Sequence, residues 1–464
     1  MEFFRHNWTS TLALLLLLLA IPLTITLGQR VQVYLAEAAV VPANITIDAA
    51  IEEGPLPQPG SGFSQGGELE YDGRTLVSIA PLSRQLSGLH TKYIRLDHLL
   101  DYPLEARLRE VVAVASMGAT PVISLSYFPS NVASTDTALP FNWIAWENAV
   151  ANLIAQVSGF NTLNIPNVYY EVWNEPDGRG FGGWRIGPGL VGFGTASKDY
   201  MELYRHTIAG SRKVFGVQPF KIGGPALADP GNTAFLDNFL AAVDRENLRL
   251  DFISWHRYHP DVGVFRQDQA NIAAILAKYP RLSGVEKLVT EWGTYPETNV
   301  AHDLNYDAAH FVSVVRTFLD GVNIATKFEI RDGPGRLGSG FGMFTYHGSP
   351  KPLAVAAALV ASVSGQRVSL SGEGSSVTGF AARDGDNLRI ILANYDKISY
   401  HTEGVPIAVS NLPLGNYLFR KTILDGYSLY GRTEETNLSL VSNTLSFQQP
   451  MLVNSVVLLE FLKQ

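Results

Sequence analysis

Short, almost wholly apolar runs alternate with longer stretches rich in alanine and leucine between about residue 90 and residue 360. The short runs predict strands at 93–96, 121–125, 168–173, 221–223, 251–255, 287–290 and 326–330. The longer stretches predict helices at 104–117, 143–157, 198–215, 234–243, 267–278 and 307–319. Strands that are apolar on both faces are typical of parallel sheets covered by helices on each side. The repeated βα units therefore predict an α/β fold, a (β/α)8 TIM barrel, with its first strand at 76–79.

The pattern changes after residue 363. Short strands separated by Gly, Asn, Asp and Pro turns follow at 368–370, 378–383, 388–394, 415–424, 438–440 and 453–461. No helical stretch of useful length separates them, which is typical of an antiparallel β-sandwich. A strand-like segment at 43–51 precedes the barrel, and we expect it to join this sandwich. The predicted organisation is a linker and strand at 31–67, a barrel at 68–362 and a β-sandwich at 363–464.

The N-terminal segment 1–30 has the pattern of an export signal. Arg5 and His6 precede an apolar stretch at 12–27. This stretch is longer than the apolar region of most signal peptides, about 7–15 residues, and slightly shorter than a spanning helix of roughly 17–25 residues. A cleaved signal peptide and an uncleaved membrane anchor both stay open, and a buried core helix is the third alternative. Either export interpretation predicts an extracytoplasmic protein, secreted or tethered to a membrane.

Composition and charge narrow the classes of function. The chain has a formal net charge of −8, and it contains no run of Lys and Arg, so a nucleic-acid partner is not expected. It has no cysteine, which excludes disulfides, thiolate metal sites and a cysteine nucleophile. Its 7 Trp, 19 Tyr and 23 Phe are enough to build a core and also to line a groove.

The first chemical motif is the stretch YYEVWNEP, which ends at Pro176. It predicts a strand that delivers Asn174 and Glu175 to its carboxyl end, where the active sites of TIM barrels lie. Pro176 ends the strand because it lacks the backbone donor that the sheet needs. A carboxyl group among aromatic and apolar neighbours can stay protonated near neutral pH and give its proton to a leaving oxygen. The alternative interpretation is that Glu175 only caps the next helix.

The second motif, LVTEWGTY, places Glu291 at the end of another apolar strand. The two glutamates are 116 positions apart, close to three βα units with insertions, which predicts strands 4 and 7 of one barrel. Glycosidases that retain anomeric configuration need two carboxyl groups about 5–5.5 Å apart, one as acid and one as nucleophile. An ion-paired surface glutamate is the alternative interpretation of Glu291.

The two motifs resemble those of the clan of (β/α)8 retaining glycosidases with catalytic glutamates on strands 4 and 7. Within that clan the chain most resembles glycoside hydrolase family 39, which contains β-xylosidases and α-L-iduronidase. The resemblance covers residues 43–464, including the trailing sandwich. The motif EVWNEP is quite specific to the clan. The motif TEWG is less specific, but its position after EVWNEP and its distance from it support the resemblance. The resemblance implies Glu175 as general acid/base and Glu291 as nucleophile.

The resemblance also implies roles for other positions. Arg95 matches the strand-2 arginine beside the nucleophile, where a guanidinium would keep Glu291 ionised. Asn174 matches the residue that binds the sugar 2-hydroxyl. The family usually has His two residues after the arginine, whereas this chain has Asp97 followed by His98, which leaves the sugar contact there and the substrate class open. His256 and Tyr258 resemble the family's strand-6 pair and share one face of a strand.

Aromatic side chains near these motifs are further candidates for contact with a sugar, by stacking a ring on its C–H face. The predicted set is Trp184 and Trp292, with Tyr127 and Phe128 after the third strand; ordinary packing is the alternative for each. Two glycine-rich stretches, beginning at Gly178 and Gly333, match G-x-G-x-x-G by spacing but do not open a helix in a dinucleotide-type unit. We therefore expect no nucleotide, organic cofactor or metal.

These observations predict a retaining glycoside hydrolase that acts by double displacement on extracytoplasmic oligo- or polysaccharides. A β-xylosidase-like enzyme and an endo-acting exopolysaccharide hydrolase both stay open. The alternative is a catalytically silent carbohydrate-binding envelope protein on the same barrel. A barrel enzyme of another reaction class would need a phosphate site or a metal cluster, and neither is evident in the sequence.

Overall fold

The computed structural model describes residues 41–100, 104–187, 198–335 and 338–464. The apolar segment 12–27, predicted as a signal peptide or membrane anchor, lies outside these residues. Within the described ranges no helix combines the length and the apolar character that crossing a membrane requires.

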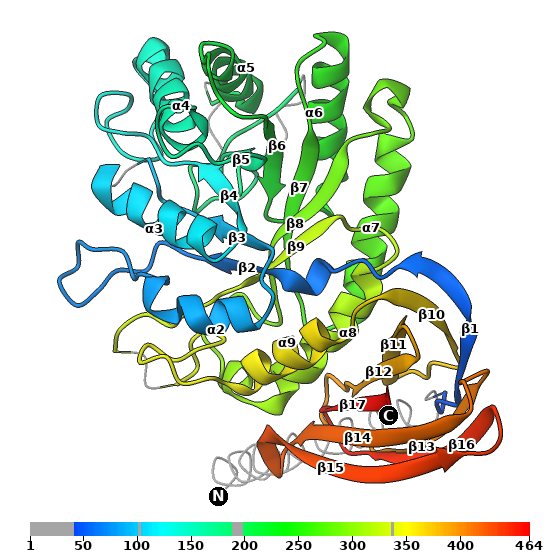
Figure 1. The fold of residues 1–464 in the computed structure, drawn as a ribbon. Helices are drawn as coiled ribbons and strands as arrows, with labels where there is room; N and C mark the ends of the chain where they lie inside the picture. The colour runs from blue at the N-terminus through cyan, green and yellow to red at the C-terminus, as the bar shows by residue number, and fades with distance from the viewer. Residues whose placement is uncertain (1–40, 101–103, 188–197, 336–337) are drawn as a thin grey trace, which may run out of the picture.

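Eight parallel strands close into a barrel in their sequence order, β2 to β9 (Figure 1). Their bounds are β2 Gly62–Gln65, β3 Tyr93–Leu96, β4 Thr120–Leu125, β5 Val168–Val172, β6 Phe220–Leu227, β7 Phe252–Tyr258, β8 Glu286–Gly293 and β9 Ile324–Phe328. This confirms the predicted TIM barrel. The seven strands predicted from 93 onward each overlap an observed strand, because each is buried on both faces and so is apolar throughout.

Helices surround this barrel on its outer side (Figure 1). They are α2 Ser83–Gly88, α3 Leu104–Ser116, α4 Trp143–Ser158, α5 Tyr200–Ser211, α6 Thr233–Arg245, α7 Val262–Leu276, α8 Asn305–Phe318 and α9 Pro352–Ser362. Several begin at a side-chain cap: Asn142, Asp199, Asn232 and Asp261 each accept a hydrogen bond from a backbone N–H of the first turn. The six predicted helices all overlap observed ones.

The first strand of the barrel is β2, so the prediction of a strand at 76–79 is wrong. Leu76, Val77 and Ile79 are buried, but they lie in the segment that leads into α2 and pair with no barrel strand. A Cβ at Gly62 would lie 2.2 Å from the backbone oxygen of Ala325, so β2 needs glycine where it meets β9. A strand of four residues with a glycine and two polar residues lacks the apolar run that marks the others. The barrel therefore starts inside the segment predicted as linker.

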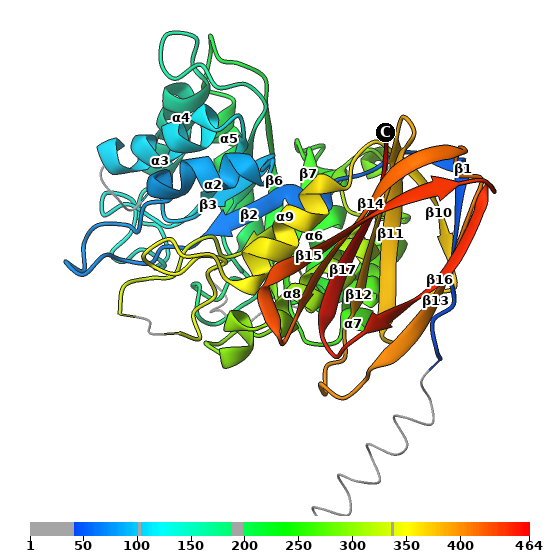
Figure 2. The same cartoon turned by 60° about the horizontal axis from the view of Figure 1, so that its bottom comes forward.

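The C-terminal residues form one nine-stranded sheet in the order β15-β14-β17-β12-β11-β10-β1-β13-β16. Its strands are β1 Ile45–Pro55, β10 Gln366–Ser371, β11 Val377–Asp384, β12 Asn387–Asn394, β13 Glu403–Ser410, β14 Gly415–Asp425, β15 Ser428–Leu440, β16 Thr444–Met451 and β17 Ser455–Lys463. Every pair is antiparallel except β1 with β13. The sheet curls on itself (Figure 2), and residues from both of its ends share one apolar core. The sequence did not predict β13 or β16.

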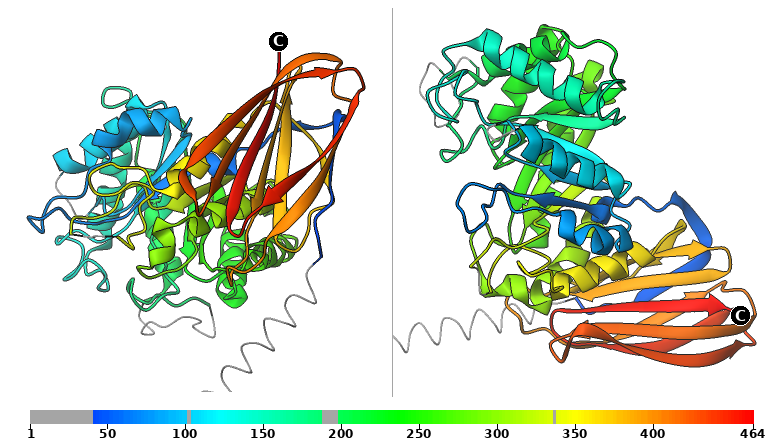
Figure 3. Two further views of the ribbon diagram at one scale, coloured as in Figure 1. Left: turned by 90° about the horizontal axis from the view of Figure 1, so that it is seen from below. Right: turned by 60° about the vertical axis from the view of Figure 1, so that its left-hand side comes forward.

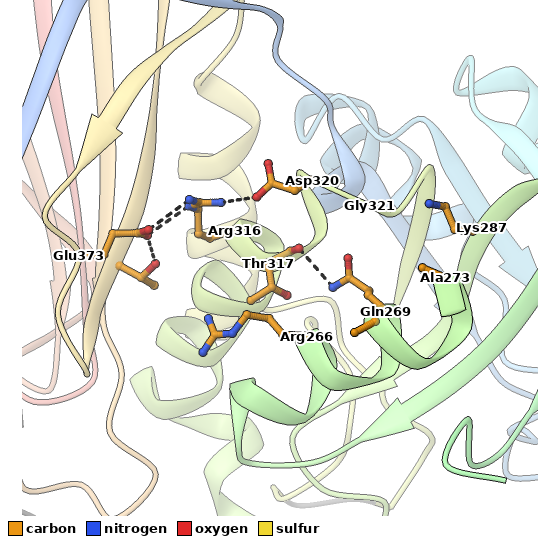
Figure 4. Close-up of a pocket in the computed structure, with 11 residues that line it drawn as sticks. Arg266, Gln269, Ala273, Lys287, Arg316, Thr317, Asp320, Gly321 and Glu373 are labelled. Atoms are coloured by element: carbon orange, nitrogen blue, oxygen red, sulfur yellow. Dashed lines mark hydrogen bonds and ion pairs between the residues drawn. The ribbon is translucent and has the colours of Figure 1, made fainter. Parts of the chain in front are cut away.

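The sheet lies against one side of the barrel (Figure 3), where α8 contacts β11, β12 and β17. Tyr395 Oη donates to the backbone oxygen of Pro260 at 2.6 Å. A polar pocket of about 470 Å³ lies along this junction (Figure 4). In it Arg316 contacts both Glu373 and Asp320. Lys287 marks the amino end of β8 there, so this pocket is remote from the carboxyl ends of the strands.

Candidate active site

The interior of the barrel changes from apolar to polar along its strands. The layer nearer the amino ends is a small apolar cluster of Val122, Tyr169, Phe252, Leu288 and Ile324. Two positions further along three of these strands, on the same face, stand Ser124, Glu171 and Ser254. Since the carboxyl ends of all eight strands meet at one mouth, the polar side chains converge there.

Arg95 on β3 is the fixed cation of this polar layer and is only 1% exposed. Its Nε donates to Glu171 Oε2 at 2.7 Å, its Nη1 to Glu291 Oε1 at 2.7 Å, and its Nη2 to Asn174 Oδ1 at 2.8 Å. Burial lowers the pKa of Arg95, but the charges of Glu171 and Glu291 outweigh this and raise the pKa above its ordinary value. Arg95 therefore stays charged beside Glu291, as the sequence predicts.

Glu291 accepts a second hydrogen bond, from Tyr258 Oη to its Oε2 at 2.9 Å. Burial raises the pKa of Glu291, and the charges of His256 and Arg95 oppose this rise. The two donated hydrogen bonds favour the ionised form of the carboxyl group. His256 and Tyr258 both face this site from β7, so they share one strand face as predicted.

Glu175 lies just beyond β5 in an unusual backbone conformation. Its φ is 46° and that of Trp173 is 73°, in the left-handed region that side chains other than glycine seldom adopt. Such residues persist only where their surroundings hold them, and they cluster at functional sites. The Glu175 N–H donates to the oxygen of Ala226 at 2.9 Å, and buried Trp173 donates from Nε1 to the oxygen of Phe181 at 2.8 Å. These contacts direct the Glu175 carboxyl group toward His256.

His256 joins the two glutamates. Its Nδ1 is 2.9 Å from Glu175 Oε1 and 3.6 Å from Glu291 Oε2. Burial lowers the pKa of His256, but Glu291 and Glu175 outweigh this and raise it above its ordinary value. One carboxylate oxygen of Glu175 and one of Glu291 lie within 4.8 Å of each other. The two strand ends therefore place the predicted pair side by side across the mouth.

A bulge in β8 orients Glu291. Leu288 faces the barrel interior, so a regular strand would turn Glu291, three residues later, outward. The pairing with β7 shifts between Val289 and Glu291, which leaves Thr290 as an extra residue. A bulge of this kind re-aims the side chains that follow it. Glu291 consequently faces inward, and Trp292 faces the helices.

Trp292 and Trp184, predicted as sugar contacts, are fully buried and pack against other aromatic rings. Trp292 stacks on Phe311 of α8 with ring centroids 5.5 Å apart, on the outer side of the barrel, because of the bulge. Trp184 packs edge-to-face on Trp173 at 5.4 Å. Phe128 belongs to the same cluster, 4.6 Å from Trp173. These rings support the backbone that carries Glu175 and do not line the opening.

The remaining predicted residues form one wall beside Arg95. Asn174 Nδ2 donates to Tyr127 Oη at 3.1 Å, and the Tyr127 ring packs on His98 with centroids 4.4 Å apart. Asp97 accepts hydrogen bonds from the backbone N–H of His98 and from Ser126 Oγ, at 2.8 and 2.9 Å. Burial raises the pKa of Asp97, but the charges of His98 and Arg95 outweigh this and lower it. Half-buried His98, not Asp97, is thus the more accessible of the two.

Two buried acids at the site, Glu171 and Asp177, had no role predicted from the sequence. Glu171 forms an ion pair with Arg95. In the sequence it could have been noticed as a single charged residue inside an otherwise apolar strand. Asp177 accepts hydrogen bonds from the backbone N–H groups of Ala228 and Asp229. Burial raises the pKa of Asp177 to about 6, against these hydrogen bonds and with help from the Glu175 charge. Nothing in the spacing of the motif distinguishes Asp177 from an ordinary loop residue.

Within the described ranges, Glu175, His256 and Glu291 form a group close enough to hold a metal ion. Arg95 contacts one of these three, Glu291, at 2.7 Å, so a cation bound there would face a fixed positive charge. The arrangement suits acid and nucleophile chemistry on two neighbouring carboxyl groups better than metal coordination.

Known proteins resemble the chain in both sequence and fold. A "Beta-xylosidase" from Caldicellulosiruptor saccharolyticus is 26% identical over 325 residues, which span 62% of this chain and 60% of that relative. The crystal structure of a monomeric β-xylosidase from Caulobacter crescentus CB15 matches with a TM-score of 0.71 and 22% identity, over 91% of this chain and 99% of that one. A glucosidase from Croceicoccus marinus matches with a TM-score of 0.70 and 18% identity, over 91% and 99%. These structural matches establish the fold.

The family assignment follows from a match to a family as a whole. Residues 77–398 match the family described as Glycosyl hydrolases family 39, and they include both glutamates and most of the barrel. The match covers well over half of the chain and agrees with the closed barrel and the trailing sheet. The chain therefore belongs to glycosyl hydrolase family 39.

Proposed function

We propose that the protein is a retaining glycoside hydrolase with Glu291 as nucleophile and Glu175 as general acid/base. The proposal rests on their proximity, since one carboxylate oxygen of Glu175 lies within 4.8 Å of one of Glu291. Retaining enzymes have carboxyl groups about 5–5.5 Å apart, whereas inverting enzymes need roughly 6.5–9.5 Å to admit a water molecule. Family membership and the relative named β-xylosidase support the same reaction class.

The reaction proceeds in two displacements. A Glu291 oxygen attacks the anomeric carbon, the bond to the leaving oxygen breaks, and the Glu175 proton passes to that oxygen. Water then attacks the same carbon while Glu175 takes its proton, and the bond to Glu291 breaks. Arg95 and Tyr258 donate to Glu291 and keep it ionised before attack. His256 Nδ1 orients Glu175 Oε1.

The proposed substrate is an O-linked oligo- or polysaccharide, cleaved as a β-xylosidase would or within an exopolysaccharide. The name of the Caldicellulosiruptor relative supports the first form. Asn174, Arg95 and His98 are the proposed contacts for the sugar on one wall, and His256 and Tyr258 on the other. Asp97 acts there by holding His98 through its backbone N–H.

Hydrolysis of an aryl glycoside panel tests the mechanism: β-xyloside, β-glucoside, β-mannoside and α-iduronide. We expect wild type to turn over at least one, and Glu291→Ala to lower kcat by a factor on the order of 10⁴ or more. Azide should then rescue Glu291→Ala and give a glycosyl azide of inverted configuration, because azide replaces the missing nucleophile.

The matched control is Glu286→Ala, at the other end of the same strand, where Glu286 contacts Tyr169 and not the site. This variant should keep wild-type kcat. Turnover that survives in Glu291→Ala would refute the assignment of the nucleophile.

Export through residues 12–27 is the proposed route to an extracytoplasmic substrate, supported by Arg5 and His6 ahead of the apolar stretch. Fractionation of expressing cells tests it. Protein in the cytoplasmic fraction alone, with an intact N-terminus, would contradict export.

A further inference from the structure

A small hairpin follows the first barrel strand and carries an exposed tyrosine at its tip. Leu69 and Leu76 form an antiparallel bridge, and the Glu70 N–H donates to the oxygen of Thr75 at 2.7 Å. Asp72 Oδ1 accepts hydrogen bonds from the backbone N–H groups of Arg74 and Thr75, both at 2.8 Å. The turn is therefore ordered, and it presents Tyr71 with 74% of its surface exposed.

A second tyrosine meets Tyr71 from a loop that is distant in sequence. The ring of Tyr346, in the segment after β9, lies 5.6 Å from that of Tyr71 at an angle of 84°. Tyr346 Oη donates to Glu70 Oε2 at 2.5 Å, and the Arg331 guanidinium lies 4.7 Å from the Tyr346 ring. These contacts fix the position of Tyr346, whereas most of the Tyr71 ring is exposed to solvent. Figure 1 shows the two loops as neighbours, blue and yellow, beyond the ends of β2 and β9.

The base of the hairpin borders the candidate active site. A Cβ at Gly67 would lie 2.0 Å from His98, whose ring packs on Tyr127 beside Asn174. Gln65 at the end of β2 also anchors the other loop, since its Oε1 accepts a hydrogen bond from the Arg331 N–H at 3.0 Å. Both loops therefore start at the mouth, and Tyr71 and Tyr346 stand on its rim.

The rim they occupy lies across the mouth from the general acid. β9 is the fourth strand from β5 in either direction around the closed barrel. Glu175, which follows β5, protonates the leaving oxygen in the proposed mechanism, so the departing group lies toward its side. The opposite rim faces the part of the substrate that is retained on Glu291.

We propose that Tyr71 and Tyr346 form a stacking platform for a sugar unit beyond the one attacked, on the retained side of the scissile bond. Exposed aromatic rings bind the C–H faces of sugars by apolar burial, at low entropic cost when they are already ordered. The inference rests on the proposed function and narrows its substrate to a saccharide chain, cleaved at least two units from its non-reducing end.

Kinetics on two substrates of the same sugar test the platform: the aryl monoglycoside and the matching hexasaccharide (xylohexaose, cellohexaose or mannohexaose). We expect Tyr71→Ala to lower kcat/KM for the hexasaccharide about fivefold to tenfold. The aryl monoglycoside, which does not reach the rim, should keep its wild-type value. Tyr71→Phe should restore the hexasaccharide value because it keeps the ring.

The matched control is Tyr430→Ala, whose side chain is 71% exposed on β15 of the C-terminal sheet and not on a barrel loop. This variant should keep the wild-type kcat/KM for both substrates. Equal losses on both substrates with Tyr71→Ala, or no loss on either, would overturn the platform. Release of single sugars alone from the non-reducing end of the hexasaccharide by wild type would also overturn it.

Calorimetric titration of the three hexasaccharides into Glu291→Ala separates the platform from catalysis. Binding that weakens when Tyr71→Ala is added supports the platform, even if wild type hydrolyses none of the glycosides, in which case only the proposed function fails. Binding of none of the three, or binding that is indifferent to Tyr71, overturns the platform while leaving any measured hydrolysis intact.

Discussion

At the scale of single residues, Arg95 organises the site because a buried guanidinium requires partners in several directions. It binds Glu171, Glu291 and Asn174 with three different nitrogens, and these partners come from two segments, β5 with the residues just after it, and β8. Breaking a buried ion pair leaves a charge without compensation, which costs about 3–5 kcal/mol. Glu171 therefore has a structural meaning that is independent of sugar binding: it balances the charge of Arg95 from within the barrel.

Replacing Tyr258 with phenylalanine tests the electrostatics of Glu291. Tyr258 donates to the Glu291 carboxylate at 2.9 Å, which favours the ionised form. Burial already raises the pKa of Glu291 against the charges of His256 and Arg95, and loss of the Tyr258 donor should raise this pKa further. Attack requires the ionised form, so the acid limb of the kcat/KM profile should move to higher pH.

Tyr200→Phe is the matched control for this experiment. Tyr200 is fully buried and donates to the backbone oxygen of Val172 at 2.9 Å, not to a carboxylate. Its loss should lower the free energy of unfolding by about 1 kcal/mol and leave the acid limb in place. An acid limb of Tyr258→Phe that stays at the wild-type pH, or moves to lower pH, would contradict the role given to Tyr258.

At the scale of elements, the β8 bulge and the short β2 strand shape the mouth. The extra residue, Thr290, turns Glu291 inward and Trp292 outward. The sequence pattern does not reveal such an insertion. The residues LVT before Glu291 are apolar or β-branched, so they fit a strand equally well with or without the bulge. That is why the sequence predicted the position of Glu291 and misassigned its neighbour.

Gly62→Ala tests the close approach of β2 to β9. The new Cβ would lie 2.2 Å from the backbone oxygen of Ala325, which cannot give way without moving β9. We expect a loss of roughly 1–3 kcal/mol in the free energy of unfolding, measured with denaturant. Gly88→Ala is the matched control, because a Cβ there meets nothing within 4 Å. Equal stability of the two variants would contradict the assignment of β2 to a closed barrel.

At the scale of the whole molecule, the N-terminal strand β1 completes the C-terminal sheet. It lies between β10 and β13. The chain therefore contributes one strand to the sheet before the barrel and the other eight strands after it. Three of its eleven residues, Ile45, Ile47 and Ala49, are buried in one core with residues from β12 and β17. The barrel is thus enclosed in sequence by the sheet that packs on its side.

Truncation tests this connection. A chain that starts at Leu56 lacks β1, exposes the facing edges of β10 and β13, and loses part of the sheet core. We expect it to aggregate or to melt at a clearly lower temperature, measured by scanning calorimetry. A chain that starts at Val41 keeps every described contact and should melt as the full chain does. Equal melting of both truncated chains would show that β1 is dispensable.

The sequence by itself determined the barrel, the trailing β-rich region and the two glutamates at strand ends. It could do so because strands covered on both faces are apolar throughout. A polar residue that directly follows such a strand lies at its carboxyl end, where the mouth of the barrel is. The predicted helices follow for a similar reason, since their apolar periodicity is a local property of the chain. Arg95, His256 and Tyr258 were found through motifs that lie on single strands.

Only the tertiary structure decided the features that depend on contacts between distant segments. These are the glycine-dependent strand β2, the bulge that separates Glu291 from Trp292, and the burial of Trp184 in an aromatic cluster. The meeting of Tyr71 and Tyr346 belongs with them, because the two rings are brought together by loops from opposite ends of the barrel sequence. Register, burial and rim geometry are set by the partner segment, and no local pattern of apolar and polar residues records which partner that is.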